Sequence, residues 1–189
     1  MRIRPYRRRR LDRTTRARYD ALLAAHLDGA PDRPDDLTRY LDHLASLETF
    51  AFHGSNHRLD ELRTTQAKDT RDFGNQHAVY ATPDPHWAMY YALVNRQNAW
   101  NLRNASMAFG PRARTRWYWR DVRVADPAAP LTVDGYLHVL PRDGFRAEPR
   151  VAGLVDLVHW ATDAAVTPLF VLPVAVAQYP LARLIRRVP

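Results

Sequence analysis

His53, Gly54 and Ser55 follow a short apolar run, Thr49–Phe52, and together they form a polar turn that can hold a ligand. Histidine supplies a directed hydrogen bond. Glycine has no Cβ, so a flat group can lie against its backbone. The apolar run is typical of a β-strand that closes at the glycine. This pattern therefore predicts a binding site at the carboxyl end of a strand.

A second strand, expected over Ala78–Thr82, carries Tyr80, and a helix expected over residues 86–97 carries Tyr91 eleven positions later. Aromatic faces attract a cationic ring, so two tyrosines on opposite sides of such a ring would stabilise it. Tyr90 is the alternative to Tyr91. Two small residues complete the motif: Ala81 beside Tyr80, and Ala88 on the helix.

In this order and at this spacing, the motifs resemble the ADP-ribosyltransferases of the diphtheria-toxin and poly(ADP-ribose)-polymerase type. The resemblance covers about residues 49–97 and 155–176. It implies that the chain binds NAD+ as its substrate, without a metal. It further implies a transferase that cleaves the N-glycosidic bond to nicotinamide and passes ADP-ribose to a protein or nucleic-acid acceptor.

The resemblance also implies a role for each residue. His53 would bind a ribose, Gly54 and Ser55 would read the carboxamide, and Tyr80 and Tyr91 would stack on nicotinamide. A loop over residues 64–75 would cover the dinucleotide. Further contacts would come from Ala81, Ala88 and Tyr90, with Arg58, Arg63 or Arg71 available for the pyrophosphate.

The third motif of the family is a catalytic glutamate, and the matching segment here, Val158–Ala161, carries His159 in its place. The expected catalytic residues are therefore His53, Tyr80 and His159. A neutral histidine offers little charge against a developing cation, which argues against chain elongation more than against single transfer. The nearest carboxylates, Glu148 and Asp163, are the alternatives for the missing glutamate.

The net charge of +8 is concentrated at the N-terminus. Residues 1–18 hold nine Arg and one Asp, whereas the other residues hold 19 basic and 19 acidic side chains. This basic arm, Arg2–Arg18, is expected either to contact nucleic-acid phosphates in a salt-sensitive way or to be a solvated tail.

Composition excludes several classes. The chain has no cysteine, so disulfides, thiolate metal sites and thiol nucleophiles are excluded, and it has no His-Glu-x-x-His motif or Gly-rich phosphate loop. It has no apolar run of the roughly 20 residues that a membrane-spanning helix needs. We expect no membrane span and a cytoplasmic location.

The order of elements predicts an α+β fold: a pair of small antiparallel or mixed sheets with flanking helices. Residues 1–18 form the arm, 19–48 a helical N-terminal lobe, and 49–189 the ADP-ribosyltransferase-like domain. Residues 59–62 are expected to be helical and 100–114 are ambiguous. The further strands are expected over 117–124, 136–141, 156–161 and 169–175.

Two other interpretations remain open. The chain is a non-catalytic module that binds NAD or ADP-ribose, or it is a nucleic-acid-directed member of the fold, related to enzymes that modify bases or terminal phosphates or to RNA 2′-phosphotransferases. Trp117 and Trp119 alternate with arginines and could stack on bases. We favour the simpler interpretation of this run, a strand with one buried face.

Overall fold

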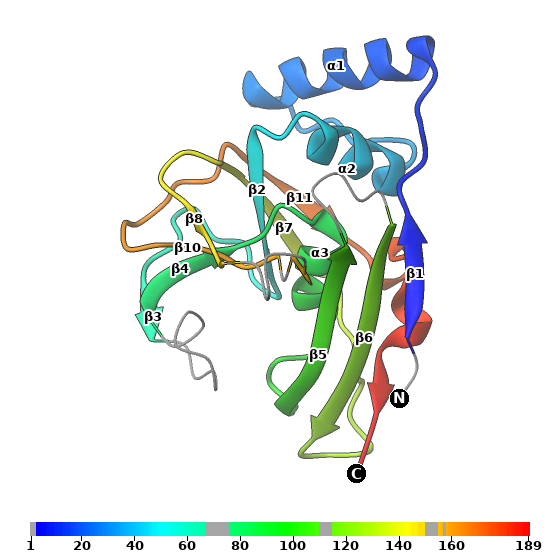
Figure 1. Ribbon diagram of the computed structural model, residues 1–189, viewed down its shortest axis with the longest axis vertical. Coiled ribbons are helices and arrows are strands. Elements are labelled where there is room, and N and C mark those ends of the chain that lie inside the picture. Colours follow the sequence, from blue (N-terminus) through cyan, green and yellow to red (C-terminus); the bar gives the residue numbers. More distant parts are fainter. Residues whose placement is uncertain (1–2, 67–75, 110–114, 150–154, 157) are drawn as a thin grey trace.

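The computed structural model describes residues 3–66, 76–109, 115–149, 155–156 and 158–189. Within these ranges the chain is α+β, with three α-helices and three small sheets (Figure 1). The α+β class is as predicted, but the sheets number three rather than two. Arg2 of the predicted arm and residues 67–75 of the predicted covering loop, which include Arg71, lie outside the described residues.

Two helices precede the main body and lie together at one end of the molecule (Figure 1): α1, Arg13–Leu27, and α2, Leu37–Ser46. Each begins at an aspartate whose side chain accepts a backbone N–H of the first turn, Asp12 for α1 and Asp36 for α2. The apolar stripe of α2 is buried in the main core. The predicted helical N-terminal segment is therefore present.

The largest sheet contains β1 (Arg4–Arg7), β6 (Thr115–Val124), β5 (Ala99–Phe109) and β9 (Val155–Asp156), in that order. Two short 3-10 helices, Val176–Gln178 and Ala182–Leu184, lead to β12 (Arg186–Arg187), which pairs with β6 in parallel. Part of the predicted basic arm is therefore a strand of the body, because β1 is hydrogen-bonded along β6. In Figure 1 this sheet lies in front of α3.

The two smaller sheets carry the predicted motifs. One has the order β3 (Thr65–Gln66), β4 (His77–Ala81), β10 (Trp160–Thr162) and β8 (Arg146–Ala147), and the other β11 (Phe170–Val174), β7 (Gly135–Pro141) and β2 (Phe50–Ser55). They meet where Phe52 and Thr82 exchange two backbone hydrogen bonds of 2.8 and 3.0 Å.

Three local predictions were wrong. Residues 59–62 are not helical, because Leu62 exchanges backbone hydrogen bonds with Val166 and is held in an extended conformation. The predicted loop begins with strand β3, which pairs with β4. The predicted strand over 156–161 is two strands in different sheets, with Val158 between them at a φ of 59°.

Helix α3, Pro85–Leu93, lies at the centre of the molecule and packs against β2 and β7. Asp84 caps its first turn, with proline at the first helical position as the sequence suggested. The helix ends four residues earlier than predicted. Asn56 holds this end, because its side chain donates to the carbonyls of Ala92 and Val94 and accepts from the backbone N–H of Arg96.

Two glycines permit the close approach of α3. A Cβ on Gly54 would overlap the carbonyl of Ala88 and lie 2.6 Å from the backbone nitrogen of Ala92. A Cβ on Gly135, in the next strand of the sheet, would overlap the carbonyl of Ala92. The obstacles are backbone atoms of a helix, which cannot move aside as a flexible side chain can.

We therefore expect Gly54→Ala to lower the free energy of unfolding by about 3 kcal/mol or more, the upper range of overpacking. Urea unfolding followed by circular dichroism measures this. Gly29→Ala is the control: its φ of 84° is strained for alanine, but no atom lies within 4 Å of the new Cβ, so a loss of only about 1 kcal/mol is expected. Equal losses in the two variants would show that close packing at Gly54 is not limiting.

Candidate functional site

His53 lies within β2 and is held there by the strand that carries Tyr80. The predicted end of this strand at the glycine was wrong, because Gly54 and Ser55 continue the pairing with β7. Nδ1 of His53 donates a hydrogen bond of 2.8 Å to the Tyr80 carbonyl. Burial lowers the pKa of His53, although this hydrogen bond opposes the shift, so the ring is neutral near pH 7. Because Nδ1 carries the proton, Nε2 is left as an acceptor, and no described residue is hydrogen-bonded to it.

His138 on β7 lies directly across the β2–β7 ladder from His53. Its Nδ1 donates to the His53 carbonyl at 3.3 Å, and its Nε2 accepts the backbone N–H of Leu59 at 2.9 Å. Burial, followed by the neighbouring His53, lowers the pKa of His138 to about 4. Sequence analysis missed this residue, because only the strand register places it opposite His53.

His159 and Glu148 form a hydrogen-bonded pair. The Glu148 backbone N–H donates to the His159 carbonyl, which extends the β8–β10 ladder by one position. On the side-chain level, Nδ1 of His159 lies 2.8 Å from a Glu148 carboxylate oxygen. The carboxylate accepts, so Nδ1 carries the proton and Nε2 is left as the second functional nitrogen. Two residues that the sequence offered as alternatives for one position are thus partners, whereas the other alternative, Asp163, is exposed beyond β10.

Trp87 connects this pair to the aromatic residues of α3. Its ring centroid lies 5.8 Å from that of His159 and 5.6 Å from that of Tyr91, one helical turn further on. Tyr91 is half-buried, and its hydroxyl lies 3.4 Å from Asn104 on β5. Sequence analysis did not select Trp87, although its i, i+4 spacing to Tyr91 is a signal that could have found it.

Tyr90, the alternative to Tyr91, is fully buried and belongs to the core. Its ring lies 4.4 Å from the guanidinium of Arg120, which is also fully buried and lies against the rings of Trp87 and Tyr118. Arg120 donates through Nε to the Tyr179 hydroxyl, whereas its two terminal nitrogens have no hydrogen-bond partner among the described residues. Tyr90 therefore offers no free face to a ligand, which favours Tyr91.

Buried carboxylates anchor the other side of α3. Asp84 accepts from the hydroxyls of Tyr118 and Ser106. Burial opposes its ionisation, but Arg116 and then His86 hold the pKa of Asp84 below its usual value. In the first turn of the helix, Nε2 of His86 lies 2.9 Å from Asp42 on α2, which also accepts a hydrogen bond from the Tyr6 hydroxyl of β1.

The remaining predicted residues fall into two groups. Ala88 and Ala81 are buried, Ala88 against Gly54 and Ala81 in the smaller core between β4 and β2. They shape the surroundings of His53 and Tyr80 without presenting a surface of their own. Ser55 accepts the backbone N–H of His57, and Arg58 and Arg63 are exposed beside Asp60 and Glu61, respectively.

The hydroxyl of Tyr80 turns back on its own strand, where it accepts from the backbone N–H of Gln76 and donates to the Gln76 carbonyl. Across the β4–β10 ladder Tyr80 faces Ala161. By strand alternation, Tyr80 lies on the same side of this sheet as the His159–Glu148 position, two residues along β10.

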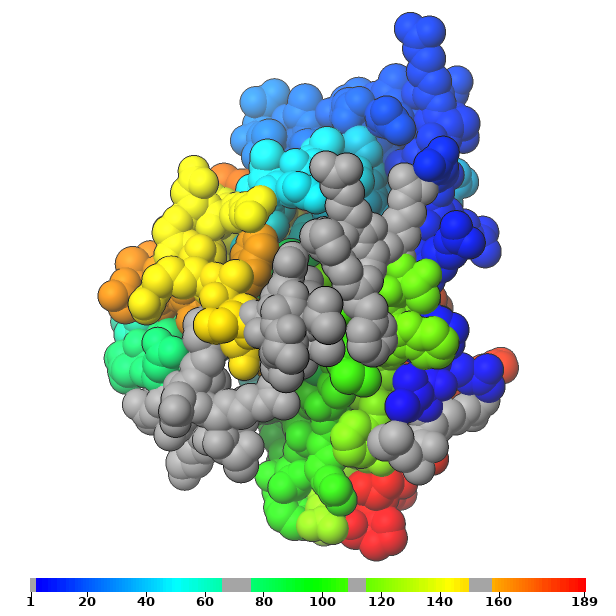
Figure 2. All heavy atoms as spheres, in the orientation of Figure 1, coloured from blue at the N-terminus to red at the C-terminus, as the bar shows by residue number. Residues whose placement is uncertain are grey.

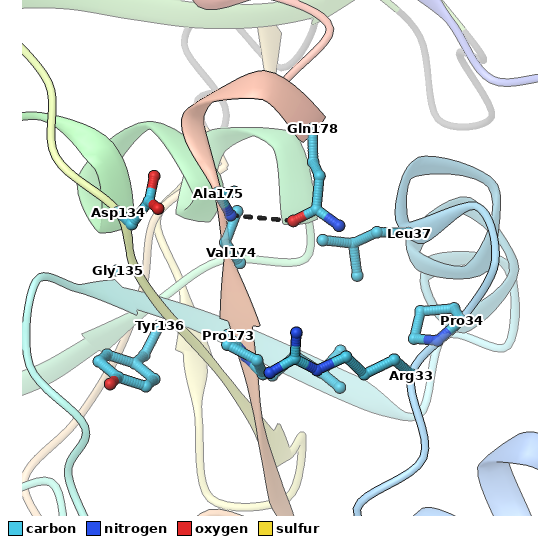
Figure 3. A pocket seen from close by; sticks show the side chains of 11 residues that line it. Arg33, Pro34, Leu37, Asp134, Gly135, Tyr136, Pro173, Val174, Ala175 and Gln178 are labelled. Carbon is cyan, nitrogen blue, oxygen red and sulfur yellow. Dashed lines mark hydrogen bonds between the residues drawn. The ribbon is translucent and has the colours of Figure 1, made fainter.

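A hollow of about 290 Å³ lies elsewhere, where β7 and β11 meet the start of α2 (Figure 3). Arg33 extends across it toward Pro173, and Gln178 is held by a hydrogen bond to the backbone of Ala175. The volume is at the lower limit of small-molecule sites. None of the predicted site residues lines it.

Among the described residues, no group of three or more His, Asp and Glu is arranged to hold a metal ion. In the same part of the chain, no helix combines the length and the apolar character needed to cross a bilayer. Comparisons with protein-family models, with curated proteins and with solved structures found no match.

The lowered pKa values of His53 and His138 predict that the protein loses stability in mild acid. His138 and His53 are neutral when folded and have lowered pKa values, whereas an unfolded histidine binds a proton near pH 6.5. Their contribution is complete above about pH 6.5 and is lost as the pH falls toward 4. We expect the shift of His138 alone to lower the free energy of unfolding by roughly 2 kcal/mol between pH 7 and pH 5, and His53 to add a loss in the same direction.

Urea unfolding at the two pH values measures this loss. His138→Gln removes the titrating ring, so the variant should be less stable at pH 7 but should lose less stability on going to pH 5. An unchanged pH dependence in the variant would show that other groups control acid stability.

Proposed function

We propose that this protein binds NAD+ and transfers ADP-ribose to an acceptor, as the ADP-ribosyltransferase resemblance implies. One observation carries the proposal: the three motifs meet around β4. His53 is hydrogen-bonded to the carbonyl of Tyr80. Helix α3, which carries Tyr91, begins four residues after the end of β4. Strand β10, which follows His159, pairs with β4. Unrelated motifs would have no reason to converge on one strand.

His53 suits a ribose-binding role. Its Nε2 is an acceptor, its tautomer is fixed by the Tyr80 carbonyl, and its lowered pKa keeps it an acceptor at neutral pH. A ribose hydroxyl would donate to Nε2. The neighbouring backbone at Gly54 is drawn toward α3, so this hydrogen-bonding position is rigid.

The His159–Glu148 pair supplies the carboxylate that the motif lacked. As nicotinamide leaves with the electron pair of the glycosidic bond, the ribose becomes cationic at C1′. With His159 neutral, the pair carries the negative charge of Glu148 and favours that cation. The acceptor then forms its bond to C1′ and gives its proton to Nε2 of His159, while Glu148 stabilises the resulting imidazolium.

The aromatic residues support the same assignment. Tyr91 is the half-buried tyrosine of α3 and lies beside Trp87, which also contacts His159. A cationic nicotinamide ring between Tyr91 and Tyr80 would be attracted by both faces.

The test is the release of nicotinamide from NAD+ by the purified protein, with and without a cell lysate as the source of acceptor. Release stimulated by lysate supports transfer, and release without lysate supports hydrolysis of NAD+ at the same site. If NAD+ binds by calorimetry but no nicotinamide is released, the protein is the non-catalytic binding module. If NAD+ does not bind, the proposal fails.

Variants of the pair sharpen the test. Glu148→Gln keeps a hydrogen-bond acceptor for His159 but removes the charge, so nicotinamide release should fall by about a hundredfold, the lower range for acid–base catalysis. Its effect should be on kcat rather than on the affinity for NAD+. The matched control is Glu48→Gln, which neutralises an exposed carboxylate outside the candidate site and should leave the rate unchanged. Similar rates for both variants would remove Glu148 from the mechanism.

A further inference from the structure

Strand β6 divides its residues between two faces of the five-stranded sheet. Tyr118, Arg120 and Val122 are buried toward α3, as the favoured interpretation of this run predicted. Trp117 and Trp119, which alternate with them, therefore lie on the outer face. This outer face is turned toward the viewer in Figure 1, with α3 behind β5, and Figure 2 shows the molecule from the same side with all heavy atoms.

Tryptophan is concentrated on this outer face. Trp117 is 39% exposed and Trp100, at the start of β5, is 62% exposed, both high values for so large an apolar side chain. Trp119 lies between them along the sheet and is partly exposed. No described residue covers Trp100 beyond the contact with Arg123 described next. Exposed aromatic residues that share one flat surface indicate an interaction site.

Arginines are interleaved with these rings. The guanidinium of Arg103 lies 6.0 Å from the Trp119 ring, and that of Arg123 lies 5.5 Å from the Trp100 ring. Arg7 of β1 is exposed opposite Thr115 on the same side of the ladder. Asp121, the acidic residue of β6 on this face, is paired with Arg186, whose Nε and one terminal nitrogen both donate to the same carboxylate oxygen. The described part of the face is therefore positively charged.

We propose that this outer face, formed by Trp100, Trp117, Trp119, Arg7, Arg103 and Arg123, binds single-stranded nucleic acid. Bases stack on exposed aromatic rings regardless of sequence, and arginines placed between the rings contact the phosphates. A duplex hides its bases and would use only the arginines. The positive charge of the outer face excludes a basic partner. An acidic protein would pair with the arginines but would have no bases to stack on the exposed indole rings.

This proposal does not depend on NAD+ chemistry, because the outer face and the His53–His159 region lie on different sheets. It also differs from the sequence-based hypothesis of nucleic-acid binding by the basic arm, because it rests on the exposed tryptophans and arginines of the outer face. Deleting residues 1–18 would remove β1 and the bond from Tyr6 to the buried Asp42, so point substitutions on the outer face are the sounder test.

The experiment is fluorescence anisotropy with labelled oligothymidylate and oligouridylate of about 12 nucleotides, in the absence of NAD+. We expect binding that weakens steeply with salt and that quenches tryptophan fluorescence. Trp100→Leu and Trp117→Leu should each weaken binding about fivefold or more, whereas Trp117→Phe should restore most of the loss because it keeps an aromatic face.

Two arginine variants distinguish binding at the outer face from non-specific attraction of nucleic acid to positive charge. Arg103→Ala should weaken binding, whereas Arg33→Ala, which removes the same charge beside the hollow of Figure 3, should not. Circular dichroism confirms folding, which substitutions at exposed positions should not disturb.

Three results would overturn the proposal: equal affinity of the leucine variants and the wild type, preference for a duplex of the same sequence, or equally strong competition by poly-glutamate. The last would identify an acidic protein surface as the partner. Failure of NAD+ binding would leave the proposal intact, so the two functions are tested separately.

Discussion

The contact between α3 and the glycines of β2 and β7 sets the position of every other element around the candidate site. Gly54 and Gly135 bring two strands against the backbone of Ala88 and Ala92, closer than any side chain would allow. Because α3 follows β4 after a short turn, this contact also fixes where β4 crosses β2. The His53–Tyr80 hydrogen bond forms at that crossing. A glycine that resembled a ligand-binding residue in the sequence is thus first a packing requirement.

The opposite side of α3 is held by charges rather than by close packing. Asp84, His86 and Arg120 are all fully buried, and each connects the helix to a different element: Asp84 to β6, His86 to α2 and Arg120 to the tyrosine after the first 3-10 helix. Removing one partner of such a group is costly because the remaining charge stays buried. These contacts give the helix one orientation, in which the buried Trp87 lies between His159 and Tyr91, whereas Tyr90 is enclosed in the core.

The sequence was most informative where local chemistry decides structure. The aspartates that cap α2 and α3 and the apolar stripe of α2 follow local sequence patterns. The strand that carries His53 was also predicted, although β2 continues past the glycine to Ser55. Pairing between strands that are distant in the sequence could not be predicted. No local pattern indicated that Arg4–Arg7 pairs with β6 or that residues 156–161 belong to two sheets. The position of His138 opposite His53 likewise depends on the register of β2 and β7. The same limit applied to the candidate site. Glu148 and His159 were competing candidates for one position because their partnership depends on a register between two very short strands.

That partnership changes how the missing glutamate is understood. A histidine alone would be either neutral, with little effect on a cationic ribose, or protonated and repulsive to it. Hydrogen-bonded to Glu148, it can take up a proton while the pair as a whole rises only from −1 to neutral. Neither state repels a cation. The arrangement separates two duties that one glutamate would combine: Glu148 holds the charge, and Nε2 of His159 handles the proton. A site built in this way suits a single transfer to an acceptor that must lose its proton as the new bond forms.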